Sequence, residues 1–168
     1  MTRETRLVGG MLGLVSLGIL AAVTACTGII AAGASPKLRI LFRVMCHGLE
    51  SRCLILWDTP MPICSRCFAI YAGLLLGVVA FAGVAVLRSH SLPLIGLIAL
   101  TVPLALDGVS QAAGLRESFN ELRTMTGILA GWGFAVWCLG AVESSARARQ
   151  KILKFETLTP DHAARSEP

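Results

Sequence analysis

The run LVGGMLGLVSLGILAAVTACTGIIAAGA, residues 7–34, decides the fold, because no charged side chain interrupts it. A helix needs about 20 apolar residues to cross the hydrocarbon core of a bilayer. The run exceeds that length, so we expect one long, tilted transmembrane helix. A short basic leader, residues 1–6, precedes it.

A four-residue motif inside this run allows a second interpretation. Residues 23–26 read VTAC and resemble a lipobox, so a lipoprotein signal cleaved before Cys26 would remove the first span. The apolar run continues past Cys26 to residue 34, where a mature lipoprotein usually has a polar tether. This continuation favours the uncleaved transmembrane helix.

Three more apolar stretches follow, at residues 68–87, 92–107 and 124–142. The chain is 55% hydrophobic and only 15% charged, far outside the range of ordinary soluble domains. We therefore predict an all-α fold, an integral membrane four-helix bundle over residues 7–145. Two glycine pairs at GxxxG spacing predict close helix contacts: Gly73 with Gly77, and Gly127 with Gly131.

The net charge of +5 lies mostly near the ends of the chain and in the loops. Aromatic and basic residues are not interleaved, so we expect membrane lipids and no nucleic acid as partners. Four spans place both termini on one side. The basic leader and the tail, residues 146–168, which we expect to be basic and then disordered, favour cytoplasmic termini. The protein is then a multi-pass protein of the cell membrane with extracytoplasmic motif loops, although arginines in those loops weaken the asymmetry.

The segment after the first span, residues 37–47, alternates bulky apolar residues with Lys37, Arg39 and Arg43. This pattern is typical of an amphipathic helix that lies in the membrane interface. It would carry Cys46 and His47 at its C-terminal end. An ordered surface loop, residues 46–67, completes the motif region and places Trp57 at headgroup depth.

Four cysteines and one histidine gather in this loop region. A CxxC pair places two thiolates to share a tetrahedral ion, and an upstream Cys-His pair supplies further ligands. The candidate metal ligands, with zinc as the first choice, are Cys46, His47, Cys64 and Cys67. Neighbouring side chains on a helix diverge by about 100°, so Cys53 or Asp107 is an alternative to one of the Cys46–His47 pair.

The same cysteines permit two other interpretations. Cys64 and Cys67 lie at the start of a helix with Arg66 between them, which favours a reactive thiolate. The layout is similar to that of quinone-coupled disulfide-forming membrane proteins and vitamin K epoxide reductases, so a thiol–disulfide oxidoreductase using quinone is the first alternative. A non-catalytic scaffold stapled by disulfides or a structural metal is the second.

Polar residues return where the third span ends. Asp107 and Gln111 are four residues apart, and three further polar residues share a second helical spacing: Arg116, Asn120 and Arg123. An ionisable side chain at membrane depth costs at least about 2.5 kcal/mol when unpaired, so it is a functional hypothesis by default. With Arg66, these residues are the candidate catalytic cluster. The alternatives are an ion pair that locks helices together and an arginine site for a lipid phosphate.

Four ordered motifs resemble a bacterial and archaeal family of small membrane proteins known as a domain of unknown function. They are FRxxCH from Phe42, PxCxRCxxxYxG from Pro62, PLxLDGxxQ from Pro103 and LRxSxNxLRxxTG from Leu115. The resemblance implies a multi-span helical protein and no established activity. The family pattern usually has glutamine and serine where this chain has Gly48 and Cys53. Cys53 is therefore an extra thiol relative to that pattern, which favours a site built from Cys46, His47, Cys64 and Cys67. We therefore expect a metal-dependent membrane protein that handles a lipid headgroup or a small anion.

Overall fold

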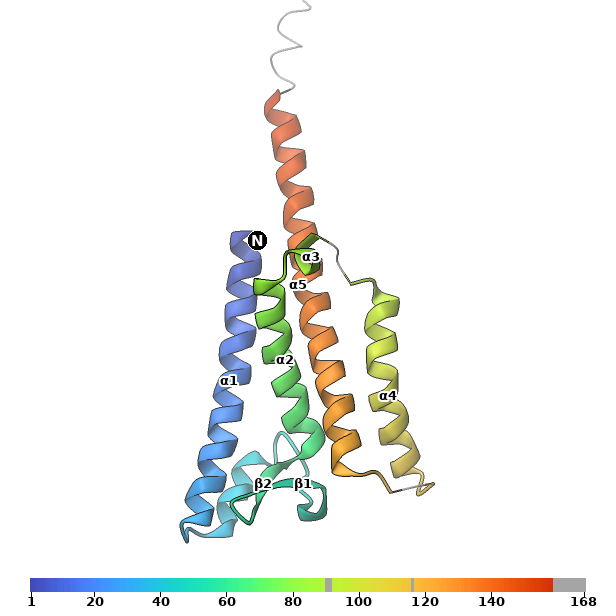
Figure 1. Ribbon diagram of the computed structural model, residues 1–168. Coiled ribbons are helices and arrows are strands. Elements are labelled where there is room, and N and C mark those ends of the chain that lie inside the picture. Colours follow the sequence, from blue (N-terminus) through green and yellow to red (C-terminus); the bar gives the residue numbers. More distant parts are fainter. Residues whose placement is uncertain (90–91, 116, 159–168) are drawn as a thin grey trace, which may run out of the picture.

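The computed structural model describes residues 1–89, 92–115 and 117–158 (Figure 1). Within these residues, four helices are long and apolar enough to cross a membrane, which confirms the expected all-α membrane fold. They are α1 (Arg3–Ala31), α2 (Ser65–Gly83), α4 (Leu94–Ala112) and α5 (Asn120–Leu158). The short α3 (Ala85–Ser89) follows α2 at the end of the bundle where the N-terminus lies.

Glycines allow α2 and α5 to pack against each other along the middle of the bundle. A Cβ added to Gly73 would lie 2.3 Å from the carbonyl oxygen of Ile128, and one added to Gly131 would lie 2.2 Å from that of Ile70. Both distances are far below van der Waals contact, so only glycine fits. The two GxxxG pairs thus face each other, as their spacing predicts.

The helix α1 begins at Arg3, so most of the expected leader is its first turn. Thr2 caps this helix, since its side chain accepts a hydrogen bond from the backbone N–H of Thr5. Both threonines also reach Glu143 on α5: the backbone N–H of Thr2 donates to Oε2 at 2.8 Å, and the hydroxyl of Thr5 donates at 2.7 Å. These bonds join the start of α1 to the middle third of α5.

The expected surface loop contains a small antiparallel sheet, β1 (Cys53–Leu56) and β2 (Thr59–Cys64). Trp57 and Asp58 form its two-residue turn with φ values of 52° and 54°, the left-handed pair that a type I′ hairpin requires. The hairpin packs under α1 through an apolar cluster of buried residues: Val23, Cys46, Met61, Ile63 and Cys64.

The expected interfacial helix over residues 37–47 is shorter and of a different kind. Pro36–Phe42 form a 3-10 helix, η1, capped by the side chain of Ser35. A turn over residues 43–45 follows, and residues 46–49 have no regular structure. A second 3-10 helix, η2 (Glu50–Arg52), leads into β1. Cys46 and His47 therefore lie on irregular backbone rather than on a helix.

The helices extend beyond the apolar runs at the end of the bundle that carries the hairpin. Polar motif residues therefore lie in helical end turns: Arg66 in α2, Asp107 and Gln111 in α4, Asn120 and Arg123 in α5. An apolar run shows which part of a helix contacts lipid, but the helix itself can continue beyond that run where its polar side chains find hydrogen-bond partners. At the opposite end, α5 continues past the expected span to Leu158, and the expected disordered end of the tail, residues 159–168, lies outside the described residues.

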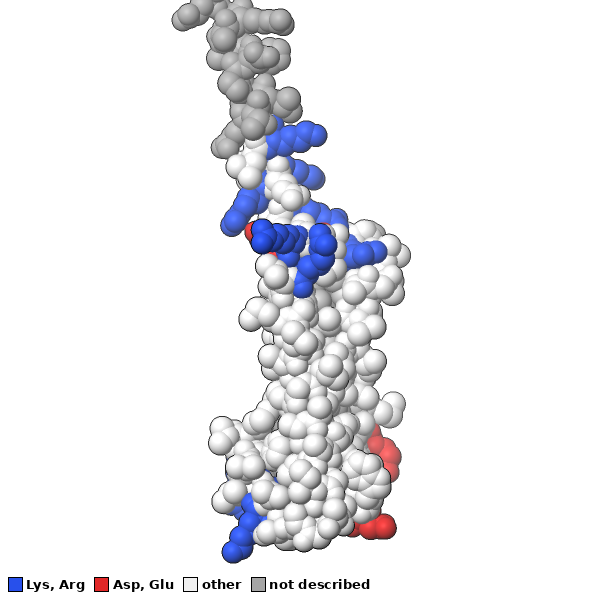
Figure 2. Space-filling model, turned by 90° about the vertical axis from the view of Figure 1, so that its left-hand side faces the viewer, with Lys and Arg blue, Asp and Glu red and all other residues white. Residues whose placement is uncertain are grey.

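Figure 2 shows how charge divides the molecule on the face in view. Basic side chains gather around the N-terminus and along the protruding part of α5, and the middle of the bundle carries no Lys, Arg, Asp or Glu on this face. Charged residues return at the hairpin end. An apolar belt between two charged ends is the surface that a bilayer requires.

Candidate functional site

The segment Cys64-Ser65-Arg66-Cys67 starts α2 and distributes its side chains to two sides. Cys64 and Cys67 are three residues apart and share one face of the first turn. Ser65 and Arg66 reach α4 and α5 instead, as their hydrogen bonds show. One helical turn therefore contributes to a thiol–imidazole group and to a separate polar cluster.

The thiol–imidazole group brings together three of the four expected ligands. The Sγ atoms of Cys46 and Cys64 and a ring nitrogen of His47 all lie within 4.8 Å of one another. The sulfur of Cys46 is 3.6 Å from Nδ1 of His47. The fourth expected ligand, Cys67, lies beside this group with its sulfur 3.5 Å from that of Cys64.

These distances fit the donor set of a zinc site. Around a tetrahedral zinc with bonds of about 2.3 Å to sulfur, the ligand atoms lie about 3.8 Å apart. The backbone N–H of Cys64 also donates to the sulfur of Cys46 at 3.2 Å, an interaction that stabilises a thiolate. Cys46 and Cys64 are buried and Cys67 is half-buried, whereas His47 is exposed, so the group opens to its surroundings on the imidazole side.

The expected divergence of Cys46 and His47 is wrong, because these residues are not helical. Gly48 has a φ of +61°, and a Cβ on it would lie 3.1 Å from the carbonyl oxygen of Pro62. Glycine thus permits the sharp turn that directs both preceding side chains toward Cys64. The signal was present in the sequence as a glycine directly after the Cys-His pair.

The two alternative ligands lie outside the group. Cys53 is 2% exposed and its thiol donates to the carbonyl oxygen of Leu49 at 3.1 Å. Burial, with further contributions from the Cys64 and Cys46 thiols, raises the pKa of Cys53 to about 11. Asp107 binds Arg66 instead of the thiols. Cys53 is therefore a protonated packing residue at neutral pH.

Cys64 has the opposite electrostatic environment. A hydrogen bond with the Cys67 thiol is the main cause that lowers the pKa of Cys64 to about 5, and burial opposes it. The backbone amide of Cys67, the thiol of Cys46 and the charge of His47 add to the lowering. A thiolate at Cys64 near neutral pH serves either as a metal ligand or as a nucleophile.

The polar cluster is built around Asp107, which is 2% exposed. Its Oδ2 accepts two hydrogen bonds from Arg66, one of them from Nε at 3.0 Å and the other from Nη2. The same Nη2 donates to Oε1 of Gln111 at 3.0 Å. Asp107 and Gln111 thus share a face of α4, as their spacing predicts, and that face meets α2.

A second set of bonds joins α5 to the same region. Nη1 of Arg123 donates to Oδ1 of Asn120 at 2.9 Å, and the hydroxyl of Ser65 donates to the same oxygen at 3.3 Å. The Asn120 amide nitrogen donates to the carbonyl oxygen of Cys53 at 3.3 Å. Arg116, which the sequence also assigned to this cluster, lies outside the described residues.

The thiol–imidazole group and the polar cluster lie at the same end of the bundle (Figure 1). They are joined through the Cys64-Ser65-Arg66-Cys67 turn and through Asn120, which binds the backbone of β1. Asp107 and Arg123 are thus on the same side of the membrane as Cys64, which is a requirement for the thiol–imidazole group and the polar cluster to form one site.

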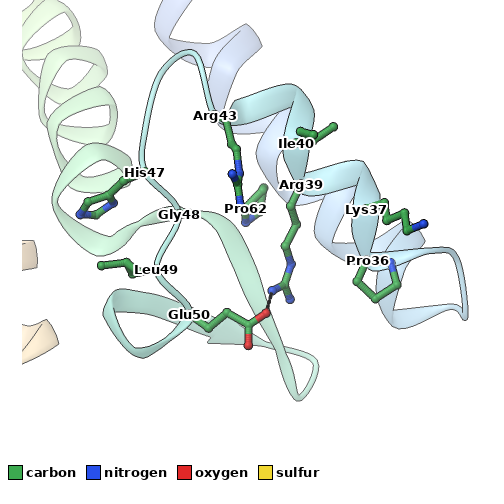
Figure 3. A pocket seen from close by; sticks show the side chains of 10 residues that line it. All are labelled: Pro36, Lys37, Arg39, Ile40, Arg43, His47, Gly48, Leu49, Glu50 and Pro62. Atoms are coloured by element: carbon green, nitrogen blue, oxygen red, sulfur yellow. Dashed lines mark hydrogen bonds and ion pairs between the residues drawn. The ribbon is translucent and has the colours of Figure 1, made fainter.

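A cavity of about 490 Å³ opens beside His47 (Figure 3). Lys37, Arg39 and Arg43 line it together with His47 and Glu50. Arg39 crosses to form an ion pair with Glu50 and also donates to the carbonyl oxygen of Pro60 at 2.9 Å. His47 therefore lies at the wall of a cavity with a surplus of basic side chains, and its ring points away from them.

Sequence reasoning missed one buried charge, Glu143, at the opposite end of the bundle. It is 2% exposed and is satisfied by Thr2, Thr5 and Arg147, whose Nε donates to it at 3.0 Å. The only local signal was the spacing of Glu143 and Arg147, four residues apart. Its role is to hold α1 against α5.

Comparison with known proteins places the chain among predicted membrane proteins. The family described as "Predicted membrane protein (DUF2085)" matches residues 46–137, which include both halves of the site. An uncharacterized protein of Methanocaldococcus jannaschii is 37% identical over 103 residues, 61% of this chain and 66% of the relative. An uncharacterized protein of Methanothermobacter thermautotrophicus is 37% identical over 95 residues, 56% of this chain and 85% of the relative. No solved structure matches the chain.

Proposed function

The chain belongs to this family of predicted membrane proteins, and we propose that it is a metal-dependent member that acts on a lipid headgroup or a small anion. The ion is zinc, held by Cys46, His47, Cys64 and Cys67. The adjoining polar cluster of Arg66, Asp107, Gln111, Asn120 and Arg123 holds the anionic partner in place.

The observation that carries the proposal is the convergence of Cys46, His47 and Cys64 within 4.8 Å. Three sulfur ligands and one imidazole are a donor set that favours zinc over harder ions. Four protein ligands close the coordination shell of a zinc ion, so a bound zinc would act as a Lewis acid toward an oxygen of the anion only by exchanging one of these ligands for it.

The residues of the polar cluster have different parts in this proposal. Arg66 is held by Asp107 and Gln111, so its charge is fixed against the last turns of α4. Asn120 fixes Arg123 in the same way. The fixed guanidinium groups compensate the negative charge of an anion without rearrangement.

We also propose that the site faces away from the cytoplasm. The basic side chains around the N-terminus and along α5 lie at the other end of the bundle. A cytoplasmic position for that end follows the positive-inside rule. Labelling single introduced cysteines of intact cells with membrane-impermeant and membrane-permeant thiol reagents, in a chain whose native cysteines are replaced by serine, tests this orientation.

Metal analysis of the detergent-purified chain tests the function. We expect one equivalent of zinc in the native chain and less than a tenth of that in Cys64→Ser, because the ion loses a thiolate ligand. Cys53→Ser is the matched control: it removes a neighbouring buried thiol that lies outside the ligand group, and it should retain the metal. Equal metal content in the two variants, or none in the native chain, contradicts the proposal.

One further observation favours a second candidate, a thiol–disulfide oxidoreductase. The sulfur atoms of Cys64 and Cys67 lie 3.5 Å apart at a helix start. Oxidation of the two thiols to a disulfide releases two electrons and two protons, which a membrane quinone accepts to become a quinol. No bound metal, together with quinone reduction that requires Cys64 and Cys67, would select this function over the first.

A further inference from the structure

A second cavity lies between η2, the C-terminal end of α4 and the start of α5. Its volume is about 490 Å³. Polar groups from three elements line its wall: Arg52 from η2, Gln111 from α4, and Glu117, Ser118 and Arg123 from the α5 side. The cavity beside His47 has none of these residues in its lining, so the two are separate.

Two buried donors in this wall have no partner among the described residues. Arg123 is only 5% exposed, and its Nε makes no hydrogen bond. Ser118 is 7% exposed, and its hydroxyl is also without a partner. A buried polar group left unsatisfied destabilises the fold, and a charged one does so more strongly. Two such groups on one cavity wall indicate that the cavity holds an acceptor.

The charges around the cavity favour an anionic acceptor. Arg52 adds a half-buried guanidinium to the buried one of Arg123, whereas Glu117, the acidic residue of the wall, is exposed. Oε1 of Gln111 is occupied by Arg66, so its amide nitrogen is left to donate. The first turn of α5 adjoins the cavity, and the N-terminus of a helix favours negative charge.

We propose that this cavity binds a phosphate group, presented either by a lipid headgroup or as free phosphate. Arg123 and Arg52 bind its oxygens through guanidinium N–H groups, Ser118 donates its hydroxyl, and Gln111 donates its amide. Arginine suits phosphate because its planar N–H groups match two phosphate oxygens at once. The volume is within the range of small-molecule sites, about 300–1,000 Å³. This inference rests on the proposed function, in which the protein acts on a lipid headgroup or a small anion. It adds that the anion is a phosphate and that this cavity binds it.

Calorimetric titration of inorganic phosphate into the chain, reconstituted in phosphatidylcholine nanodiscs, tests the site. Arg52→Gln should weaken binding about tenfold or more, because it removes a charged hydrogen-bond donor. Ser118→Ala, a small change that preserves packing, should also weaken it. Arg43→Gln is the control: Arg43 is an arginine of the other cavity, and its loss should leave phosphate binding unchanged.

A lipid arm separates the two sources of phosphate. Native mass spectrometry measures whether phosphatidic acid remains bound after extraction from mixed vesicles of phosphatidic acid and phosphatidylcholine. Retention by the native chain but not by Arg52→Gln, without binding of inorganic phosphate, assigns the site to a lipid phosphate. Binding of neither probe, or equal effects of Arg43→Gln and Arg52→Gln, overturns the inference.

Metal content measured on the same samples keeps the two proposals apart. Phosphate binding in a Cys64→Ser chain that has lost its metal supports the phosphate site alone. Metal without phosphate binding supports the metal centre and rejects the phosphate site.

Discussion

Replacing Asp107 by asparagine should destabilise the bundle by about 3 kcal/mol, because it leaves the Arg66 charge without its counter-ion. The Asp107 carboxylate is 2% exposed and the Arg66 side chain 20% exposed. Removal of one partner from a buried pair costs about 3–5 kcal/mol, and we take the lower end because Arg66 reaches some solvent. Asparagine has the same shape, so the change isolates the charge.

Another arginine–carboxylate pair at this end of the molecule supplies the control. Arg39 pairs with Glu50, whose side chain is 71% exposed. Exposed pairs contribute about 0–1 kcal/mol, so Glu50→Gln should have little effect. The two variants differ in the burial of the carboxylate and share the chemistry of the change.

Thermal unfolding in detergent, followed by tryptophan fluorescence, measures the difference. For a chain of this size, 1 kcal/mol corresponds to about 2–4 °C in Tm. We therefore expect Asp107→Asn to lower Tm by about 6–12 °C and Glu50→Gln by less than about 4 °C. A fall in Tm that is no larger for Asp107→Asn than for Glu50→Gln would refute the reasoning, since burial would then not decide the value of the pair.

Two further predictions follow from the helix interface and from the thiols. Gly131→Ala should lower Tm in the same assay, since its Cβ would lie 2.2 Å from the Ile70 carbonyl oxygen and overpacking costs about 1–3 kcal/mol. Gly18→Ala is the control and should leave Tm unchanged, because a Cβ there would have nothing within 4 Å. Equal changes in Tm for the two variants would contradict the contact between α2 and α5. In the metal-free chain, Cys64 should react with iodoacetamide at half its maximal rate near pH 5, the pKa to which its neighbours lower it. Cys53, with a pKa of about 11, should stay unmodified. Mass spectrometry of the adducts formed at a series of pH values shows which cysteine reacts first. Because the folded pKa of Cys64 lies below the ordinary thiol value of 9.0, its contribution to stability is full above that value and is lost as the pH falls toward 5.

The membrane helices and their main contact could be predicted because both depend on local composition. An uncharged run of sufficient length specifies a span, and glycines at fixed spacing specify a close approach. The pairing of Gly73 with Ile128 and of Gly131 with Ile70 then adds only the identity of the partner helix. Predicting the spans and the close contact therefore requires no knowledge of residues far away in the sequence, except that another helix packs alongside.

The hairpin could not be predicted in this way. Its strands are short, and its turn uses Trp57 and Asp58 at positive φ, where glycine or asparagine is the usual signal. Tertiary packing under α1 through Met61 and Ile63 stabilises a turn that the local sequence disfavours. The partners of Glu143 were hidden for a related reason, since Thr2 and Thr5 precede it by 141 and 138 residues.

The sequence names candidate residues for the site but does not give their geometry. Cys46, His47, Cys64 and Cys67 are recognisable as candidate ligands from residue type and spacing, and the structure brings three of them together. Whether Cys46 and His47 point the same way depends on Gly48, whose positive φ and contact with Pro62 are properties of the folded chain. The two unsatisfied donors Arg123 and Ser118 are likewise visible only once the cavity between η2, α4 and α5 is formed.

The position of α4 links the two sites. Asp107 is the one buried residue of α4, and the helix otherwise packs against α5 through half-buried apolar side chains such as Leu100, which contacts Gly133. Its bond to Arg66 attaches it to the turn that also carries Cys64 and Cys67. Gln111, one turn further along α4, is held by the same guanidinium and lines the second cavity. We therefore propose that Asp107 acts by positioning: through Arg66 it would set the distance between the thiol–imidazole group and the wall of the cavity in which we place the phosphate.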